Sequence, residues 1–427
     1  MRAIVAFLFL LVTTISVEAA TWFLEADGSG DAPHILAAID SAAPGDTILL
    51  NDGVFTGTGN RFLIVPGSLG GLTIRSVNGP DFTTVDLAFN NGFSLSAVNV
   101  SIEGLTVVNG SNWVGGGVQV NAMGASVRNC RIENCVGNGG AIGLWAGSVE
   151  VTDCVIADCY GGYNGSVAYA VGGAAMLFER CLMLRNGVCP IISAVPLTIR
   201  NCTFWESEGG VGSTGSTISM TGALLTIEHS ILAAGSGANP VIAPNVSISC
   251  TNIYGNTPGD WVGHLAGLDT VNGNFSLDPK FCDTANGDFS LRPGSPCIDA
   301  PGCGQVGFGG EGCAIISTGV TDGRPLAGDD RAEGDAAGSF ASLFQVAPNP
   351  FGAETAVFLT RSLADGGSLT VHDLAGRTVY GQSVSPLVRS IVWNGFDNDG
   401  RRLPSGVYFL RVDAKNESET RRIVIMR

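Results

Sequence analysis

The chain has 427 residues, a formal net charge of −16 and only 14% charged residues. It is too long for one ordinary compact domain, and lysine occurs only at Lys280 and Lys415. A strongly acidic chain without a basic patch repels phosphate backbones, so nucleic-acid binding is excluded. An acidic polysaccharide would be repelled in the same way unless a cation bridged it.

Residues 1 to 20 have the features of a secretory signal peptide. Arg2 precedes an apolar run from Ala3 to Val12, and the small residues Val17 and Ala19 fit a cleavage site. The apolar run is too short to span a membrane, and no later segment qualifies. We therefore expect a secreted or cell-surface protein without a transmembrane segment in the mature chain.

Residues 25 to 55 predict a short helix that covers one end of the structure that follows. The pair Pro44-Gly45 ends this helix. Repeat proteins need such a cap, because the outermost repeat would otherwise expose its apolar interior. The apolar residues that share one face of the helix are Ile35, Leu36, Ile39 and Ala42.

A phrase of ten residues recurs through the middle of the chain. Its copies read SIEGLTVVNG, SVRNCRIENC, EVTDCVIADC, FERCLMLRNG, TIRNCTFWES, TIEHSILAAG and SISCTNIYGN. Their spacing of 20 to 28 residues indicates a solenoid. The anchor residues used to measure this spacing are Gly104, Cys130, Cys154, Cys181, Cys202, Ser230 and Cys250.

Within each copy the apolar residues alternate, which is typical of a strand. The alternation breaks by one residue before the anchor, and a second short apolar run precedes each copy. We therefore expect three short strands in each turn of the chain. Asn and Asp tolerate left-handed backbone, so the chain should bend sharply at the break. Residues at the break include Asn129, Asp153, Asn201 and His229.

These turns resemble the right-handed parallel β-helix proteins, the superfamily of pectin lyases and polygalacturonases. The right hand follows from the resemblance and from the general rule for parallel crossovers. The resemblance covers residues 21 to 313, because residues 277 to 300 are similar to the closing segment common in these proteins. It implies an all-β solenoid but no particular activity, since one fold hosts many functions.

In the enzymes of this superfamily, the resemblance places the active groove along the first strand of each coil. None of the outward residues expected there is charged, whereas glycoside hydrolysis needs two carboxylates and lyase chemistry needs a base. The motifs of polygalacturonases and pectate lyases are also absent. The expected outward residues are Gln119, Gly143, Ala168 or Tyr169, Ser193 and Ser219.

Charged residues of the repeats fall instead on or beside the second and third strands. We expect them to form a solvated face with ion pairs between coils. The alternative is an acid/base pair on neighbouring coils, for which Glu150 and Glu179 are weak catalytic candidates. His229 is the one histidine in the repeats, and its place at a bend favours a turn residue over a catalytic one.

Four aromatic residues are candidates for glycan binding. Trp113, Tyr160 and Tyr163 precede first strands of the repeats, and Trp145 ends one. We expect them on consecutive coils, side by side, where exposed rings can stack on sugar faces. The alternative is that these rings pack over the glycine-rich turns.

Export makes disulfides available to the 12 cysteines. We expect Cys282 to pair with Cys297, and Cys303 with Cys313. The repeat cysteines are expected to form inward ladders of free thiols, because buried cysteine behaves as a small hydrophobe. Disulfides between coils are the alternative, and the repeat itself explains the cysteine spacing without a metal site. The two ladders are Cys130, Cys154, Cys181 and Cys202, and Cys135 and Cys159.

A second domain follows the solenoid. Residues 314 to 342 have the polar, acidic and glycine-rich composition of a linker. Residues 343 to 427 contain short alternating strands, which predict a small β-sandwich. The pieces APNPF, LTVHDLAGRTV, WNGFDNDGRRLPSGVYFLRV and TRRIVIMR resemble, in this order, the immunoglobulin-like domains related to the flagellar hook-capping protein and the type IX secretion sorting domains. The resemblance implies a bacterial exported protein with the sorting machinery as a partner.

Calcium is the one cofactor that the sequence suggests. The run from Asp397 to Gly400 is similar to an acidic calcium loop but lacks the distal Glu. We therefore expect a hairpin turn there.

Two functions are compatible with these features. The first is a non-catalytic surface or secreted protein that binds an extracellular polysaccharide or cell-surface glycan, or serves as an adhesive rod. The second is a polysaccharide lyase or glycoside hydrolase with an atypical site. The uncharged first-strand positions favour the first function, and the superfamily resemblance favours the second.

Overall fold

The computed structural model describes residues 19–161, 164–187, 189–207, 216–236, 239–284, 287–313, 344–347, 355–359, 366–373, 376–384, 390–398, 400–415 and 417–425. The predicted linker and almost all of the predicted signal peptide lie outside these residues. The chain divides into two compact units. The first runs to Asp278 and includes Asp299–Phe308, and the second comprises Pro279–Ile298 and the residues from Gly309 onward.

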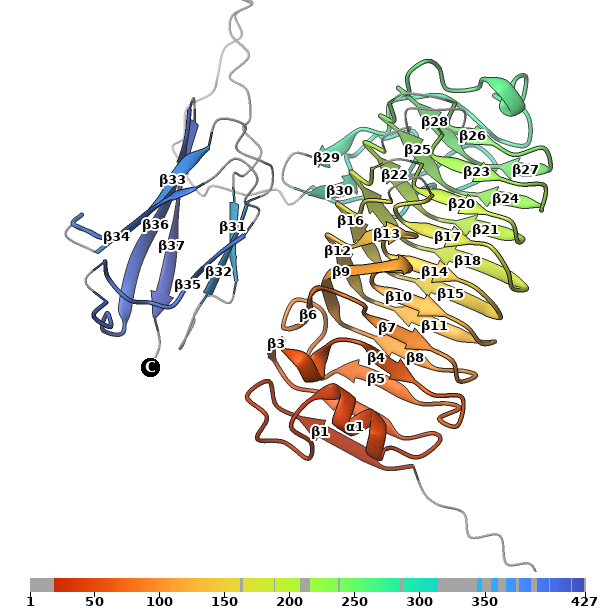
Figure 1. Ribbon diagram of the computed structural model, residues 1–427. Coiled ribbons are helices and arrows are strands. Elements are labelled where there is room, and N and C mark those ends of the chain that lie inside the picture. The colour runs from red at the N-terminus through yellow and green to blue at the C-terminus, as the bar shows by residue number, and fades with distance from the viewer. Residues whose placement is uncertain are drawn as a thin grey trace, which may run out of the picture. The chain divides into compact units, whose positions relative to one another are not determined.

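Three parallel β-sheets form the walls of a solenoid in the first unit (Figure 1). Sheet 1 contains β4 (Leu63–Val65), β7 (Phe93–Leu95), β10 (Val118–Val120), β14 (Ile142–Leu144), β17 (Ala168–Ala170), β20 (Ile191–Ser193), β23 (Ile218–Met220) and β26 (Val241–Ile242). Sheet 2 contains β1 (Thr21–Leu24), β2 (Thr47–Leu50), β5 (Thr73–Ser76), β8 (Ser101–Glu103), β11 (Ala125–Arg128), β15 (Ser148–Thr152), β18 (Ala175–Glu179), β21 (Leu197–Arg200), β24 (Leu225–Glu228) and β27 (Val246–Ser249). Sheet 3 contains β3 (Gly53–Phe55), β6 (Thr83–Asn90), β9 (Thr106–Val114), β12 (Arg131–Glu133), β16 (Val155–Ala157), β19 (Leu182–Leu184), β22 (Thr203–Trp205), β25 (Ile231–Ala233) and β28 (Asn252–Tyr254), and β13 (Val136–Asn138) pairs with β9.

The coils stack in register, so equivalent residues of successive coils lie above one another. Ile102 pairs with Val127, and Val127 with Val151, along sheet 2. All three are fully buried, as alternation of inward apolar and outward polar residues requires. The parallel β-helix predicted from the repeat is therefore confirmed.

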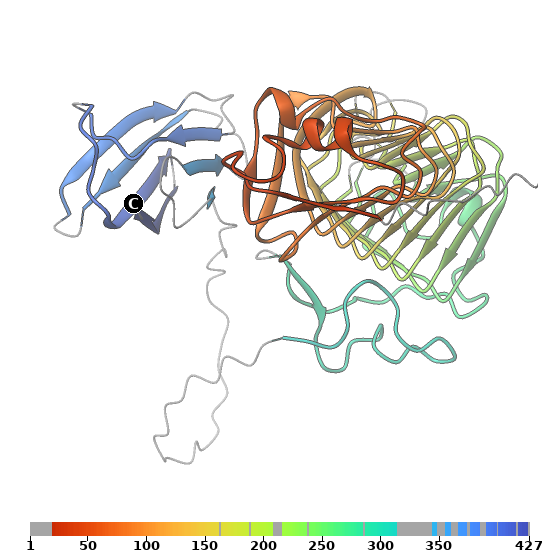
Figure 2. The ribbon, with the colours of Figure 1, turned by 90° about the horizontal axis from the view of Figure 1, so that it is seen from below.

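The predicted cap helix is present as α1 (Ile35–Ser41), and the view from below shows it in front of the later coils (Figure 2). Ile35 and Ile39 are buried against the first coils. The imidazole Nδ1 of His34 accepts the backbone N–H of Ala37 (3.0 Å) and so caps the helix. A one-turn 3-10 helix, η1 (Thr58–Asn60), lies beside it.

The other end of the apolar core is covered by a segment that directly follows the last coil. Leu265 of the 3-10 helix η2 (Gly263–Leu265) is fully buried in the solenoid core, and Trp261 and Leu268 pack against that core. No described helix has the length and apolar character needed to cross a membrane. The segment predicted to close the solenoid, residues 277 to 300, forms the antiparallel hairpin of β29 (Phe281–Asp283) and β30 (Asp288–Leu291).

The chain bends between sheets 2 and 3 at residues in the left-handed region, as predicted. Asn129, Asp153, Asn201 and His229 have φ of 49°, 56°, 51° and 48°. A second row of left-handed bends, which the sequence analysis did not predict, follows sheet 3. Its members are Asn109, Asn134, Asp158, Arg185, Glu206 and Ala234, with φ between 48° and 58°.

Two of the anchor residues used to measure the repeat are not at the inward position. Gly104 and Cys250 have positive φ and occupy the bend itself, one residue before the inward position. The inward residues of those coils are Leu105 and Thr251, which are fully buried. Asn and Asp occupy this bend in other coils. In the first and the last copy of the repeated phrase, the residue to be aligned with the inward cysteines is therefore one position later than the anchor.

Each bend interrupts the backbone ladder, and side chains of the next coil repair it. The backbone N–H of Cys202 donates to Ser230 Oγ (3.2 Å), and that of Cys130 to Cys154 Sγ (3.4 Å). At the end of the row, the N–H of Thr251 donates to Asn274 Oδ1 (3.1 Å). A buried N–H without an acceptor is costly. Small residues with an acceptor atom therefore fill a position that would otherwise be apolar.

The second bend row uses the same device. The backbone N–H of Cys159 donates to Asn186 Oδ1 (3.0 Å), and that of Gly235 to Asn256 Oδ1 (2.9 Å). The thiol of Cys135 accepts the N–H of Gly110 (3.4 Å). The predicted ladders of free thiols are confirmed, because the cysteines of both rows are buried and unbridged.

Ser230→Ala is expected to lower the stability of the solenoid by about 1–3 kcal/mol, because the N–H of Cys202 loses its acceptor. Ser230→Cys restores an acceptor and should recover most of this loss. The urea midpoint of solenoid unfolding measures both effects. Equal midpoints for Ser230→Ala and the parent protein would contradict this role for the inward row.

Burial raises the pKa of the thiols of Cys130, Cys154, Cys159 and Cys181 well above its usual value. We expect iodoacetamide at pH 9 to leave these cysteines unmodified in the folded protein and to modify them in urea. Unfolded thiols lose protons above about pH 8.5 whereas the folded ones do not, so stability should fall as pH rises past that value. Mass spectrometry of tryptic peptides reports the labelling. Rapid labelling of the folded protein would refute the buried ladder.

The predicted disulfide pairing is wrong. Cys250 pairs with Cys303 and Cys282 with Cys313, with Cα–Cα distances of 5.5 and 5.2 Å. Cys297, predicted to pair with Cys282, is buried and takes part in neither disulfide. The reason is that Cys250 stands at an outward bend rather than in the inward ladder, within reach of the returning chain.

The returning segment crosses the last coils from there. The backbone N–H of Gly307 donates to the carbonyl of His229 (2.7 Å), and that of Phe308 to Thr203 Oγ1 (3.0 Å). It therefore ties three successive coils together, with the Cys250–Cys303 disulfide at one end.

Peptide mapping without reduction should recover Cys250 joined to Cys303 and Cys282 joined to Cys313. Cys303→Ser is expected to lower stability by about 2–4 kcal/mol through the loss of one cross-link. Cys297→Ser provides the control and should leave both disulfide-linked peptides intact. Recovery of a peptide joining Cys282 to Cys297 would restore the pairing predicted from the sequence.

Two antiparallel sheets in the second unit share one apolar core. One contains β31 (Phe344–Ala347), β32 (Thr355–Leu359) and β35 (Ser390–Trp393), and the other contains β34 (Thr378–Val384), β33 (Gly367–His372), β36 (Gly406–Ala414) and β37 (Glu417–Ile425). Trp393 is fully buried in this core, and its indole N–H donates to the carbonyl of Phe396 (2.9 Å). The predicted small β-sandwich is therefore present.

Candidate functional site

The outward row of sheet 1 carries no charge. Sequence analysis placed Ser193 in this row, but its side chain is buried inside the solenoid and bonded to the carbonyl of Val195 (2.8 Å). Ile192 takes the outward position, because register pairs it with Tyr169 and Ser219. The complete outward row is Ile64, Ser94, Gln119, Gly143, Tyr169, Ile192, Ser219 and Ile242.

Glycine-rich turns cover the middle of this row. A Cβ on Gly143 would lie 2.6 Å from the backbone nitrogen of Gly115, so the turn from the preceding coil lies against the sheet. Gly139 lies in the same way against Tyr169, where its Cβ would meet the Tyr169 nitrogen at 2.7 Å. Glycine is required at these positions because any side chain would collide with backbone.

Neutral amides and hydroxyls form a hydrogen-bonded network next to the covered part. Asn112 Nδ2 donates to Gln119 Oε1 (3.0 Å), and Gln119 Nε2 donates to Asn121 Oδ1 (3.1 Å). Asn121 Nδ2 reaches Ser94 Oγ (3.3 Å) and Ser96 Oγ (3.4 Å) on the preceding coil. We call these five residues and Trp113 the amide face.

Trp113 is the most exposed aromatic of the amide face. Its side chain is 78% exposed, and its backbone N–H donates to Asn112 Oδ1 (2.7 Å). The backbone of Trp113 is therefore tied to the amide network, and its ring is open to solvent. A large apolar ring in water next to ordered hydrogen-bonding groups is characteristic of a binding surface.

The other predicted glycan-binding aromatics lie apart from the amide face. Tyr160 is 51% exposed and follows sheet 3, and its backbone bridges to Val136 of the preceding coil. Trp145, 46% exposed, follows the opposite end of β14. Tyr163 lies outside the described residues. The structure therefore does not gather Trp113, Trp145 and Tyr160 into one cluster.

The catalytic candidates are engaged in ion pairs or turns. Glu150 lies 3.8 Å from Arg128, and both side chains are largely exposed. Glu179 lies between Arg180 (3.3 Å) and Arg200 (3.6 Å). Glu150 with Arg128 and Glu179 with Arg200 are pairs between coils, as the sequence predicted. His229 has left-handed backbone, as expected of a turn residue.

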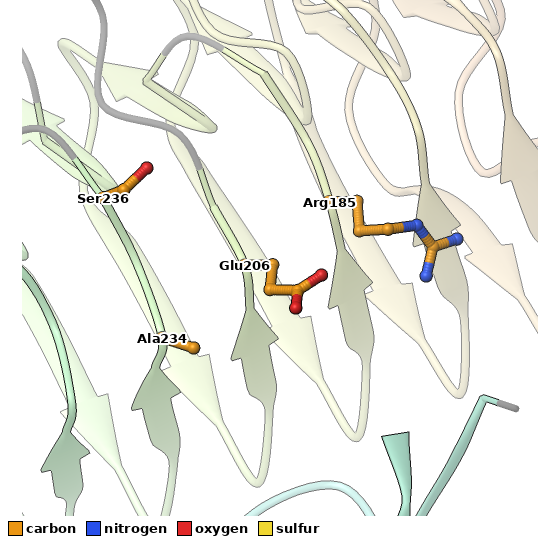
Figure 3. A pocket seen from close by; sticks show the side chains of 4 residues that line it. All are labelled: Arg185, Glu206, Ala234 and Ser236. Atoms are coloured by element: carbon orange, nitrogen blue, oxygen red, sulfur yellow. The ribbon is translucent and has the colours of Figure 1, made fainter. Parts of the chain in front are cut away.

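A shallow pocket of 360 Å³ lies at the second bend row, lined by Arg185, Glu206, Ala234 and Ser236 (Figure 3). Arg185 makes a two-pronged ion pair with Asp158 of the preceding coil, with Nε–Oδ1 at 3.0 Å and Nη2–Oδ2 at 2.7 Å. These hydrogen bonds raise the pKa of Arg185 and keep it charged. Sequence analysis missed this pocket.

The described residues contain no cluster of His, Cys, Asp and Glu that could hold a metal ion. At the run similar to a calcium loop, the N–H of Gly400 donates to the carbonyl of Asp397 (3.1 Å), and the N–H of Arg401 to Asp397 Oδ1 (2.8 Å). The predicted turn is therefore confirmed at this position.

Comparison with known proteins identifies the second domain. Residues 345–426 match the family described as the secretion system C-terminal sorting domain. This confirms the resemblance to type IX sorting domains, and the chain is exported to the cell surface or secreted. No curated protein matches the chain.

Three solved structures are similar to parts of the chain. PorZ, an essential surface component of the type-IX secretion system of Porphyromonas gingivalis, is 26% identical over 20% of this chain and 11% of PorZ, with a TM-score of 0.17. A carrot pectin methylesterase is 14% identical over 64% of this chain and 92% of its own, with a TM-score of 0.37. Pectate lyase Pel9A is 13% identical over 70% of this chain and 98% of its own, with a TM-score of 0.33. At these TM-scores, no activity is carried over to this chain.

Proposed function

We propose that the protein is a non-catalytic, exported carbohydrate-binding protein whose amide face binds a neutral polysaccharide. The observation that carries this proposal is the network from Asn112 through Gln119 to Asn121, together with the exposed Trp113, whose backbone N–H donates to Asn112. Carboxamides and hydroxyls both donate and accept hydrogen bonds, as the hydroxyls of a sugar do. The ring of Trp113 supplies an apolar surface for a sugar face.

The amide side chains are already ordered before a ligand binds, which favours binding. Each carboxamide is already held by a neighbour, so little side-chain freedom remains to be lost when a ligand binds. Asn121 bridges two coils through Ser94 and Ser96, which fixes the spacing of the polar groups along the solenoid axis. The surface therefore suits an extended chain better than a single small molecule.

Charge determines which polysaccharide this surface favours. The outward row of sheet 1 is uncharged, and the whole chain has a net charge of −16. Long-range repulsion therefore acts against an anionic polymer, and the amide face offers no cation to compensate for it. A neutral polymer meets neither obstacle. The same surface offers no carboxylate pair for hydrolysis.

Trp113→Ala is expected to weaken binding of a neutral polysaccharide by roughly 30-fold, since loss of a central aromatic contact costs about 2 kcal/mol. Affinity electrophoresis of the full chain in gels containing glucan, mannan, xylan or pectate measures the effect. Phe82→Ala provides a matched control, because Phe82 is 57% exposed and precedes β6 of sheet 3.

A second substitution tests the network itself. Asn121→Asp keeps the shape but removes the N–H groups that reach Ser94 and Ser96, so binding should weaken without loss of fold. Retardation by pectate alone, or equal retardation of the parent protein and Trp113→Ala, would contradict the proposal.

A further inference from the structure

We infer that the pocket at Arg185, Glu206, Ala234 and Ser236 is a second carbohydrate subsite, which takes one uncharged sugar unit of the polysaccharide bound by the amide face. The inference rests on the proposed function and adds a second, separate site to it. The pocket lies along the corner that follows sheet 3, several coils from Trp113.

Glu206 is the residue that the fold alone does not explain. Its φ is 49°, a left-handed conformation that glutamate adopts at a cost and that Asn and Asp tolerate. Equivalent positions of three other coils carry Asn109, Asn134 and Asp158. Among the described residues, no hydrogen bond or ion pair is formed by the Glu206 side chain. The chain therefore carries a long carboxylate where a shorter side chain would stabilise the bend better.

Arg185 forms an ion pair with Asp158 and still has unused hydrogen-bond donors. Its Nε and Nη2 hold Asp158, which fixes the plane of the guanidinium. Two of its five N–H groups are used in this way, which leaves three for another acceptor. In Figure 3 the Glu206 carboxylate lies between Arg185 and Ala234, so the donors of Arg185 and the acceptor of Glu206 border the same hollow.

Small residues keep this hollow open. Ala234 stands in the same bend row as Glu206, and its short side chain leaves room above the carboxylate. Ser236 adds an exposed hydroxyl.

The charge of these groups favours an uncharged sugar. Asp158 neutralises Arg185, so the carboxylate of Glu206 leaves the pocket with a net negative charge and repels a uronate. A carboxylate accepts hydrogen bonds from neighbouring hydroxyls, and the remaining Arg185 N–H groups donate to ring or hydroxyl oxygens.

Substitutions at the bend separate binding from folding. Glu206→Asn and Ala234→Asn both install the residue that bends favour, so the melting temperature should stay equal or rise. The first removes the carboxylate, and the second fills the hollow. Isothermal titration of the full chain with cellohexaose, mannohexaose, xylohexaose and hexagalacturonate measures binding, and each variant should bind the preferred neutral hexasaccharide at least tenfold more weakly.

Asn134→Asp changes another member of the bend row outside the pocket and serves as the control. Lost binding in Trp113→Ala with unchanged binding in Glu206→Asn overturns the subsite and leaves the proposed function standing. Lost binding in Glu206→Asn with unchanged binding in Trp113→Ala supports the subsite and contradicts the amide face. Preference for hexagalacturonate, or no binding of any hexasaccharide, overturns both.

Discussion

The fold depends on how the solenoid satisfies backbone N–H groups where its chain turns. A left-handed residue at each bend allows the sharp change of direction, but it removes the following N–H from the ladder between coils. Side-chain acceptors such as Ser230 and Asn186 restore the missing hydrogen bond from the next coil. Each coil thus completes its neighbour, which explains why the interior holds rows of Cys, Ser, Thr and Asn in an otherwise apolar core.

Because these hydrogen bonds lie inside the solenoid, the residues on its outer surface can differ from sheet to sheet. Sheet 2 and the bends carry ion pairs between coils, such as Arg200 with Glu228 (3.0 Å) and Arg180 with Asp153 (2.7 Å). Hydrogen bonds to these carboxylates raise the pKa of both arginines. The outward row of sheet 1 carries no charge, and Gln119 of this row joins Asn112 of β9 and Asn121 in the amide face. The ion pairs of sheet 2 are therefore separate from the amide face, whereas Arg185 belongs both to an ion pair between coils and to the proposed subsite.

The sequence predicted what depends on the repeat. Period, alternation and the Asn and Asp positions were enough for the coils, the bends between sheets 2 and 3 and the free thiols, and the motifs from Ala347 onward were enough for the sorting domain. It failed where contacts join distant segments: Cys250 meets Cys303 across 53 residues. It also failed at Ser193, because the adjacent apolar pair Ile191 and Ile192 makes the inward face ambiguous.

The site was harder to predict for a related reason. Gln119 was expected to point outward, but its partners Asn112 and Asn121 come from near the end of β9 and from the loop that follows β10. Their meeting depends on how the turn folds over the sheet, which no local pattern encodes. The pocket at Glu206 arises from small side chains in neighbouring coils, and a short residue such as Ala234 gives no signal of its own.

An exported solenoid that binds a neutral polysaccharide without cleaving it should be retained by the polymer and release nothing from it. To test this, the full chain is incubated with neutral and acidic polysaccharides, with and without calcium, and the soluble fraction is examined by mass spectrometry. We expect that a neutral polymer retains the protein and that no unsaturated or newly reducing oligosaccharide appears. Release of such products from any polymer would show a catalytic site and contradict non-catalytic binding.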